Sequence, residues 1–152
     1  MLSAASRATR PVLAAASHDQ RIRAVLLEST HASLITSGGN IAENQHGYPA
    51  QPTGWAISVG ASWRIGQDVT SIDPERTITR LGSRPVLLIH GTADDVDYPM
   101  TSAELNLRAA LRAQVPASLV YCPGGRHGKS VEACPELWAS SANAFFGEAA
   151  GL

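Results

Sequence analysis

The feature that most constrains the fold of this chain is a short, unbroken apolar run over residues 86–89. The run Val-Leu-Leu-Ile lies between Pro85 and His90-Gly91. Because it has no polar alternation and is bounded by turn residues, it predicts a strand that is buried on both faces. Strands of this kind belong to parallel sheets that helices cover on both sides, so the run favours an α/β architecture.

Strand and helix patterns alternate around this run. Apolar segments at 22–28 and 117–122 predict two more strands. Proline positions and apolar spacing predict helices at 11–17, from 73 to 82, from 101 to 116 and from 135 onward. We therefore expect a three-layer α-β-α domain over residues 1–152, with a small, mostly parallel sheet of three strands.

Residues 30–82 are expected to form a loop or cap region. Between Thr30 and Thr53, glycine, asparagine, proline and serine occur without a period, which predicts a long loop. Trp55, Val59 and Trp63 follow at a spacing of four and predict a short helix that covers a site. Packing is the simpler role for these three side chains, and substrate recognition is the alternative.

Charge, hydropathy and cysteine content exclude several classes of protein. The formal charge of −1 gives no reason to expect a nucleic-acid or membrane partner. The apolar runs are much shorter than the roughly 20 residues that cross a bilayer. Cys122 and Cys134 make neither a disulfide framework nor a zinc site, and a bridge between them is disfavoured in the cytosol, the compartment that we predict.

Titratable residues follow two of the predicted strands. Asp94, with Asp95 and Asp97 as weaker candidates, comes after the strand at 86–89, and His127 follows the strand at 117–122 within a glycine-rich turn. Because adjacent parallel strands lie about 4.8 Å apart, loops at neighbouring strand ends can bring Asp94 within hydrogen-bond reach of His127. A carboxylate that orients an imidazole is half of a nucleophilic triad.

Three segments resemble the α/β-hydrolases, in particular their bacterial esterase and prolyl-oligopeptidase-like branches. Residues 84–96 are similar to the acid loop, residues 123–128 to the histidine loop, and residues 21–29 to the strand after the nucleophile helix. The resemblance implies that Asp94 is the acid, that His127 is the general base and that no cofactor is needed. It covers only the C-terminal half of the family's fold, so we expect an N-terminally truncated domain.

The nucleophile is the least defined member of this set. The family's Gly-x-Ser-x-Gly motif is absent, and the segment Ala-Ala-Ser-Arg-Ala at residues 4–8 stands at the corresponding position. Ser6 is the best candidate and Ser3 the second, and the N–H of Arg7 would supply one oxyanion donor. Only five residues precede Ser6, which we take to be too few for a supporting strand.

Three other interpretations have weaker support. His90 is expected to stabilise the sheet rather than to catalyse. The Gly-Lys-Ser string at 128–130 is typical of a phosphate-binding loop, but proline occupies position 123, where that motif requires glycine. A metal site formed by His90, Asp94, Cys122 and His127 lacks a supporting ligand spacing.

The leading hypothesis is a serine hydrolase that acts on a small-molecule ester or a peptide-like bond. In this hypothesis Ser6 attacks the carbonyl, His127 transfers the proton and Asp94 orients the imidazole. The alternative is a non-catalytic remnant that serves as an assembly module and pairs its sheet edge with another chain, for example in a homodimer. A third option is a clipped reading frame with its own nucleophile motif upstream.

Overall fold

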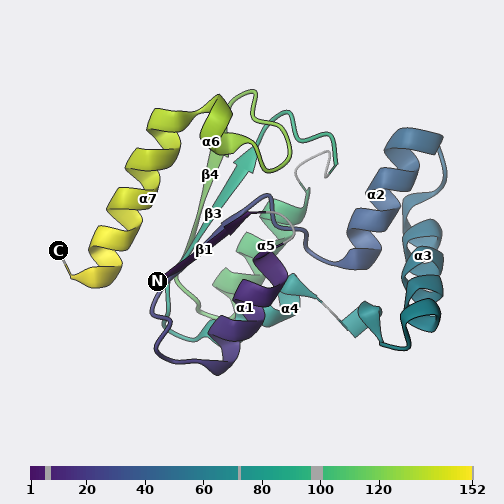
Figure 1. Cartoon of the computed structure of the whole chain (residues 1–152), viewed down its shortest axis with the longest axis horizontal. Coiled ribbons are helices and arrows are strands. Elements are labelled where there is room, and N and C mark those ends of the chain that lie inside the picture. Colours follow the sequence, from purple (N-terminus) through teal and green to yellow (C-terminus); the bar gives the residue numbers. More distant parts are fainter. Residues whose placement is uncertain (6–7, 72, 97–100, 152) are drawn as a thin grey trace.

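The computed structural model describes residues 1–5, 8–71, 73–96 and 101–151, and four parallel strands form its centre (Figure 1). Their order in the sheet is β1-β2-β3-β4, and each neighbouring pair is parallel. The strands are β1 (Leu2–Ala5), β2 (Val25–Glu28), β3 (Val86–Gly91) and β4 (Ala117–Cys122). The predicted α/β class with a small parallel sheet is confirmed.

Seven α-helices and two short 3-10 helices connect and cover the described strands. They are α1 (Thr9–His18), α2 (Leu34–His46), α3 (Ala50–Ile65), η2 (Val69–Ser71), α4 (Pro74–Ile78), η3 (Thr79–Leu81), α5 (Thr101–Arg112), α6 (Ser130–Ala133) and α7 (Pro135–Ala150). In Figure 1, α7 lies on one side of the sheet and α1, α4 and α5 lie on the other. This arrangement gives the predicted three layers.

The expectation of three strands is wrong, because β1 adds a fourth. Its register aligns Leu2 with Val25 and Ala5 with Glu28, so four residues suffice to form a strand next to β2. The segment Leu-Ser-Ala-Ala carries no β-branched or aromatic residue and has little strand propensity of its own. The hydrogen bonds offered by β2 decide its conformation, and no local pattern could indicate them.

Two apolar clusters form the core, one on each face of the sheet. Val25, Leu27, Val86 and Leu88 pack with buried side chains of α1, α4 and α5. Leu26, Leu87 and Ile89 point to the opposite face and pack against α7 through Trp138, Ala142, Phe145 and Phe146. Successive strand residues therefore alternate between two buried faces, as the apolar run predicted.

The long loop expected between residues 30 and 53 is wrong, because α2 and the start of α3 occupy most of it. The two helices pack closely where glycines remove the side chains. A Cβ on Gly54 would lie 2.0 Å from the Ile35 carbonyl oxygen, and one on Gly39 would lie 2.3 Å from that of Ala50. Ser33 caps the start of α2 by accepting the Thr36 N–H, and Gly47 ends the helix with φ 70°. The glycines that suggested a loop are thus the contact surface of a helical hairpin.

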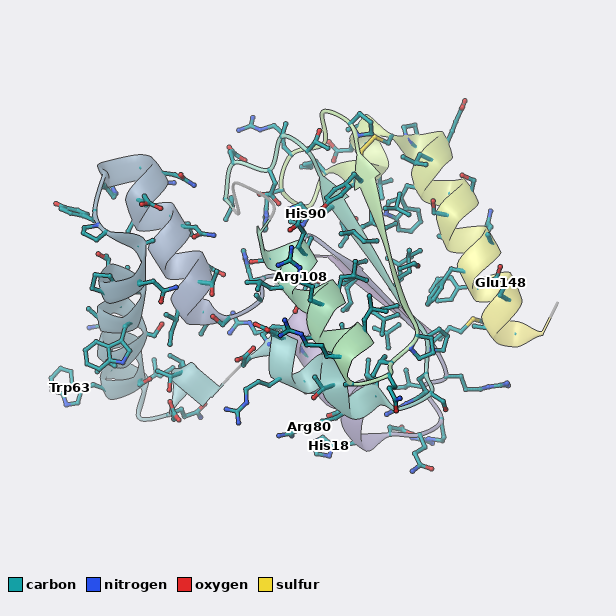
Figure 2. The ribbon with its side chains drawn as sticks, turned by 180° about the vertical axis from the view of Figure 1, so that it is seen from behind. His18, Trp63, Arg80, His90, Arg108 and Glu148 are labelled. Atoms are coloured by element: carbon teal, nitrogen blue, oxygen red, sulfur yellow. A yellow bond between two sulfur atoms is a disulfide. The ribbon has the colours of Figure 1, made fainter. Side chains whose placement is uncertain are left out.

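The predicted packing face of α3 is also wrong. Trp55 and Trp63 are 59% and 89% exposed, and Val59 is exposed as well. Figure 2 shows Trp63 on the outer side of α3, pointing away from the sheet. The inner side of α3 carries small residues instead: Gly54 and Ser58 are buried, and Gly54 packs against α2.

The remaining helices agree largely with the sequence patterns. Asp73 caps α4, Ile78 and Leu81 are buried, and Gly82 follows η3 with φ 63°. In α5, the apolar spacing places Ala103, Ala110 and Leu111 on one face, but Ala103 and Ala110 are buried whereas Leu111 is exposed. Thr101 and Glu104 have the spacing of a capping box, and Met100 precedes them, but the side chains of Met100 and Thr101 lie outside the described part of the chain. No helix within the described ranges has the length and hydropathy needed to cross a bilayer.

Candidate active site

The carboxyl ends of the four parallel strands meet at one edge of the sheet, and three polar loops leave from it. The loop after β2 carries Ser29 and His31, the loop after β3 carries Asp94, and the loop after β4 carries His127. Functional groups of parallel α/β sheets gather at this edge. Asp94 and His127 therefore follow neighbouring strands at the same edge of the sheet.

Asp94 and His127 are in contact. Nδ1 of His127 lies 2.8 Å from Oδ2 and 3.0 Å from Oδ1 of Asp94. The Asp94 side chain is fully buried, whereas that of His127 is 15% exposed. Because an ionised carboxylate only accepts hydrogen bonds, Nδ1 donates to Asp94 in this pair, and Nε2 is then the basic nitrogen of the neutral ring. The predicted contact is confirmed, and it leaves the imidazole able to accept a proton.

Two further groups contact the Asp94 carboxylate. The Val96 N–H donates to Oδ1 over 3.0 Å, and Nε2 of His90 lies 3.2 Å from Oδ2. His90 is buried at the end of β3. A buried carboxylate needs such partners, since it has lost its hydration. His90 thus contacts the acid rather than the solvent. That it stabilises the sheet through a hydrogen bond stays a prediction.

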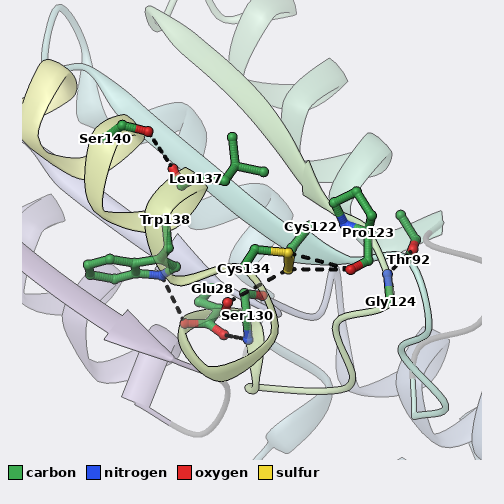
Figure 3. Close-up of a disulfide and its surroundings, with 10 residues drawn as sticks. All are labelled: Glu28, Thr92, Cys122, Pro123, Gly124, Ser130, Cys134, Leu137, Trp138 and Ser140. Atoms are coloured by element: carbon green, nitrogen blue, oxygen red, sulfur yellow. Dashed lines mark hydrogen bonds between the residues drawn. A yellow bond between two sulfur atoms is a disulfide. The ribbon is translucent and has the colours of Figure 1, made fainter.

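The loop that carries His127 is tied to the end of β2 by two residues that the sequence analysis did not single out. The Gly128 N–H donates to the Ser29 hydroxyl over 2.9 Å, and the Ser130 N–H donates to Oε1 of Glu28 over 2.7 Å. The other carboxylate oxygen of Glu28 accepts the indole N–H of Trp138 (Figure 3). Glu28 is buried, so its position at the end of an apolar strand was the one local signal of this role.

Ser29 holds a backbone conformation that is rare outside glycine. Its φ is 49°, and the residue is fully buried. A non-glycine residue in this region stores about 1–3 kcal/mol of strain, which the surrounding contacts must offset. The hydrogen bond from Gly128 is one of these contacts. The strained turn therefore helps to join the β2 end to the histidine loop.

A disulfide between Cys122 and Cys134 closes the same loop (Figure 3). The expectation of unbridged cysteines is wrong. Cys122 ends β4 and Cys134 directly precedes α7, so the bridge spans the segment that contains His127. Sequence separation alone could not show that the turn brings the two side chains together. The cytoplasmic location stays a prediction, and a disulfide is more typical of oxidising compartments.

Glycines set the spacing between the acid and histidine loops. A Cβ on Gly91 would lie 2.1 Å from the Gly125 carbonyl oxygen, so only glycine fits there. Gly124 and Gly128 adopt φ values of 70° and 65° on either side of His127. The Ala93 N–H donates to the Gly125 carbonyl, and the Gly124 N–H donates to the Thr92 hydroxyl. This close approach brings the Asp94 carboxylate to the imidazole.

Asp95, the weaker candidate for the acid, faces a different partner. Its carboxylate forms a 2.5 Å ion pair with Arg126. This hydrogen bond holds the pKa of Asp95 below, and that of Arg126 above, their ordinary values. Asp95 therefore links the two loops at the surface, while Asp94 faces the imidazole. Asp97, the third candidate, lies outside the described residues.

The nucleophile candidates occupy or follow β1. Ser6 and Arg7 lie outside the described residues. Ser3 is within β1, where it is aligned with Leu26, and Ser6 comes directly after the strand's last residue. Side chains that act at this edge of a parallel sheet follow the strand rather than lie within it. The chain position of Ser6 thus fits a nucleophile better than that of Ser3.

A cavity of about 400 Å³ opens beside His127 on the side of the α2–α3 hairpin. Its walls come from α1, the loop after β2, both helices of the hairpin, η2 and the acid loop. The ring of His31 stacks on that of His127, with centroids 5.1 Å apart and planes 18° apart. His31 and the hairpin residues were missed by the sequence analysis, because their role depends on how the hairpin packs.

A second hollow is also lined by His127 and has several charged residues in its walls. Its volume is about 640 Å³, and Asp95, Arg126, Lys129 and Glu132 contribute to its walls. Arg126 is paired with Asp95 there, and Lys129 with Glu132. His127 and Val96 line both spaces. The imidazole therefore borders both the apolar cavity and the hollow with charged walls.

Solved structures with a similar fold include peptidases and esterases. A puromycin-hydrolyzing peptidase of Mycobacterium tuberculosis aligns with a TM-score of 0.65 and 21% identity over 97% of this chain. An acylaminoacyl peptidase of Pyrococcus horikoshii aligns with a TM-score of 0.67 and 14% identity over 96% of this chain. The α/β hydrolase GrgF from Penicillium sp. sh18 aligns with a TM-score of 0.59 and 16% identity over 95% of this chain. The chain has a partial α/β-hydrolase fold.

This similarity covers only part of each neighbour. The chain spans 21% of the mycobacterial peptidase, 23% of the archaeal one and 61% of GrgF. At these identities the likeness establishes the fold and not the activity. No protein-family model and no curated protein matches this chain.

Proposed function

We propose that this chain carries the acid and the base of a serine hydrolase that acts on carboxylic ester or peptide-like bonds. The observation that carries the proposal is the contact between the Asp94 carboxylate and Nδ1 of His127 at the carboxyl edge of the sheet. Solved structures with a similar fold whose names call them peptidases or esterases support the proposal further. We propose Ser6 as the nucleophile.

In the proposed reaction, Nε2 of His127 takes the proton of the Ser6 hydroxyl while its oxygen attacks the substrate carbonyl carbon. The imidazolium then gives the proton to the departing alcohol or amine, and an acyl-serine ester remains. A water molecule then gives a proton to His127 and attacks the ester carbonyl carbon, and the imidazolium returns that proton to the serine oxygen as the carboxylic acid leaves. Asp94 holds the ring in the required tautomer and stabilises the imidazolium. The N–H of Arg7 would be one oxyanion donor.

A fluorophosphonate probe tests this proposal, because it reacts only with an activated serine. We expect labelling of the wild-type chain, mapped to Ser6 by mass spectrometry, and none in Ser6→Ala. A Ser3→Ala variant serves as the matched control and should be labelled like the wild type. If the folded wild-type chain is not labelled, or if the label is on Ser3, the assignment of Ser6 is wrong.

The assembly module remains a second candidate, and one observation favours it. β1 is the last strand on its side of the described sheet, and its four residues include no charge or proline that would protect an edge. Such a strand can pair with a strand of another chain. Light scattering tests this idea: a dimer that an Ala4→Pro substitution converts to a monomer would support it. A wild-type chain that is monomeric at every concentration would exclude it.

A further inference from the structure

We propose that the cavity between the α2–α3 hairpin and His127 binds an apolar group that bears a carboxylate, and that Arg10 pairs with this carboxylate. As a statement about substrate, the inference rests on the proposed hydrolase function. As a statement about binding, it stands on the cavity alone. The ligand class is thus an amphiphilic carboxylate.

The walls of the cavity are mainly aliphatic. Side chains from α2, α3, η2 and the acid loop contribute to them: Leu34, Ile41, Ile57, Ala61, Val69 and Val96. Two serines also line it, but their hydroxyls donate to carbonyls of their own helices, from Ser37 to Ser33 and from Ser58 to Gly54. A volume of about 400 Å³ lies within the roughly 300–1,000 Å³ that is usual for small-molecule sites. The space therefore suits an apolar group.

Arg10 is the one permanent charge among the described residues that line this cavity. It is half-buried on α1, and its guanidinium makes no hydrogen bond or ion pair with the described residues. Among the described residues that line the cavity there is no carboxylate. A guanidinium at an apolar wall favours an anion, since the attraction is less screened there than in water and two N–H groups can bind one carboxylate.

Asp73 is the competing partner within the chain. Arg10 also lines a smaller cavity of about 200 Å³ that Asp73 and Pro74 help to form. The Asp73 carboxylate, however, accepts the Arg76 N–H and caps α4. No ion pair joins it to Arg10 in the described structure. The N-cap role keeps the Asp73 carboxylate on its own helix and leaves the guanidinium available to a ligand.

Calorimetric titration with octanoate and with 1-octanol tests the inference, because the two probes share an apolar chain and differ in charge. We expect octanoate to bind more tightly than octanol, and Arg10→Gln to weaken octanoate binding by about ten-fold or more while leaving octanol unchanged. Arg108→Gln, an exposed arginine on α5 (Figure 2), is the matched control and should change neither affinity.

Further variants locate the site and identify the competing partner. Ala61→Phe fills the cavity and should abolish binding of both probes, and circular dichroism checks that the variant folds. Equal affinity for octanoate and octanol, or an Arg10→Gln variant that binds octanoate like the wild type, overturns the inference. If Asp73→Asn strengthens octanoate binding by about ten-fold or more, Asp73 holds Arg10 and the proposed availability of the guanidinium is wrong.

The binding inference and the proposed function fail in different ways. Ser6→Ala should bind octanoate like the wild type, since the hydroxyl is not needed for binding. Arg10-dependent octanoate binding in a chain that the fluorophosphonate probe does not label would support the site and contradict the hydrolase. Labelling of Ser6 without Arg10-dependent binding would support the hydrolase and contradict the anionic ligand.

Discussion

At the residue scale, the surroundings of Asp94 determine what the edge of the sheet can do. The carboxylate is buried and contacts two imidazoles, His127 at 2.8 Å and His90 at 3.2 Å. Its position is further fixed by the Val96 N–H. A carboxylate that is buried from solvent is held in place by such partners, and removal of one of them would lower the stability of the fold. The exposed Asp95–Arg126 pair beside it has no comparable constraint.

Replacement of Asp94 tests whether the acid orients the base. Asp94→Asn should lower kcat by about 10⁴-fold, because the amide stabilises the wrong histidine tautomer, as in a serine protease whose triad aspartate was changed in the same way. Asp95→Asn is the control, and loss of its surface ion pair should change kcat by less than about five-fold. Hydrolysis of a chromogenic ester measures both. Equal effects would contradict the distinct roles of the two aspartates.

A second charged pair predicts a pH effect far from the site. Hydrogen bonds from Arg21 lower the pKa of Asp19 from 3.8 to about 2. Since the folded-state pKa lies below the unfolded value, the pair stabilises the fold above about pH 4, and this contribution is lost as the pH falls toward 2. An NMR titration of the Asp19 carboxyl carbon should show the low pKa in the wild type. In Arg21→Gln the pKa should return toward 3.8, and an unchanged value would contradict the assigned cause.

At the element scale, the helical hairpin and the disulfide loop each depend on contacts between segments distant in the sequence. α2 and α3 meet at Gly39 and Gly54, where any side chain would collide with backbone. The hairpin provides most of the apolar cavity wall. The histidine loop is enclosed by Cys122 and Cys134. The hairpin therefore shapes the site through close packing of its two helices, and the histidine loop is closed by a covalent bridge.

Two glycines on α3 provide a matched test of this packing. Gly54→Ala should destabilise the fold, because its Cβ would lie 2.0 Å from the Ile35 carbonyl oxygen and force the helices apart. Gly60→Ala meets nothing within 4 Å and should stabilise the fold by up to about 1 kcal/mol through helix propensity. Chemical unfolding measures the two free energies. Equal effects of the same sign would contradict the close packing of α2 and α3.

Removal of the disulfide tests the rigidity of the histidine loop. A Cys122→Ala, Cys134→Ala double variant should lose about 2–4 kcal/mol of unfolding free energy, because the unfolded chain gains conformational freedom. The hydrogen bonds of Gly128 and Ser130 to the β2 end should still hold the loop, so hydrolysis should persist at reduced rate. Denaturation with and without a reductant gives the comparison. A wild-type chain that is insensitive to the reductant would show that the bridge contributes no stability.

At the scale of the whole molecule, helices pack on both faces of the sheet, and β1 and β4 are the edge strands of its described part. α7 packs on one face and α1, α4 and α5 on the other, while β1 and β4 end the strand order. The site lies at the carboxyl edge between the covered sheet and the α2–α3 hairpin, which stands at one side in Figure 1. The exposed Trp63 of α3 lies on the far side of that hairpin (Figure 2).

The parallel centre of the sheet and the contact between Asp94 and His127 could be predicted from the sequence. These features follow from local signals: an apolar run, proline and glycine punctuation, and the rule that parallel strands end at a common edge. β1, the α2–α3 hairpin, the bridge between Cys122 and Cys134 and the contacts of Glu28 became visible only in the folded chain. Each of these depends on a partner distant along the chain, so that the local pattern is weak or, for the glycines of α2, points to the wrong conformation.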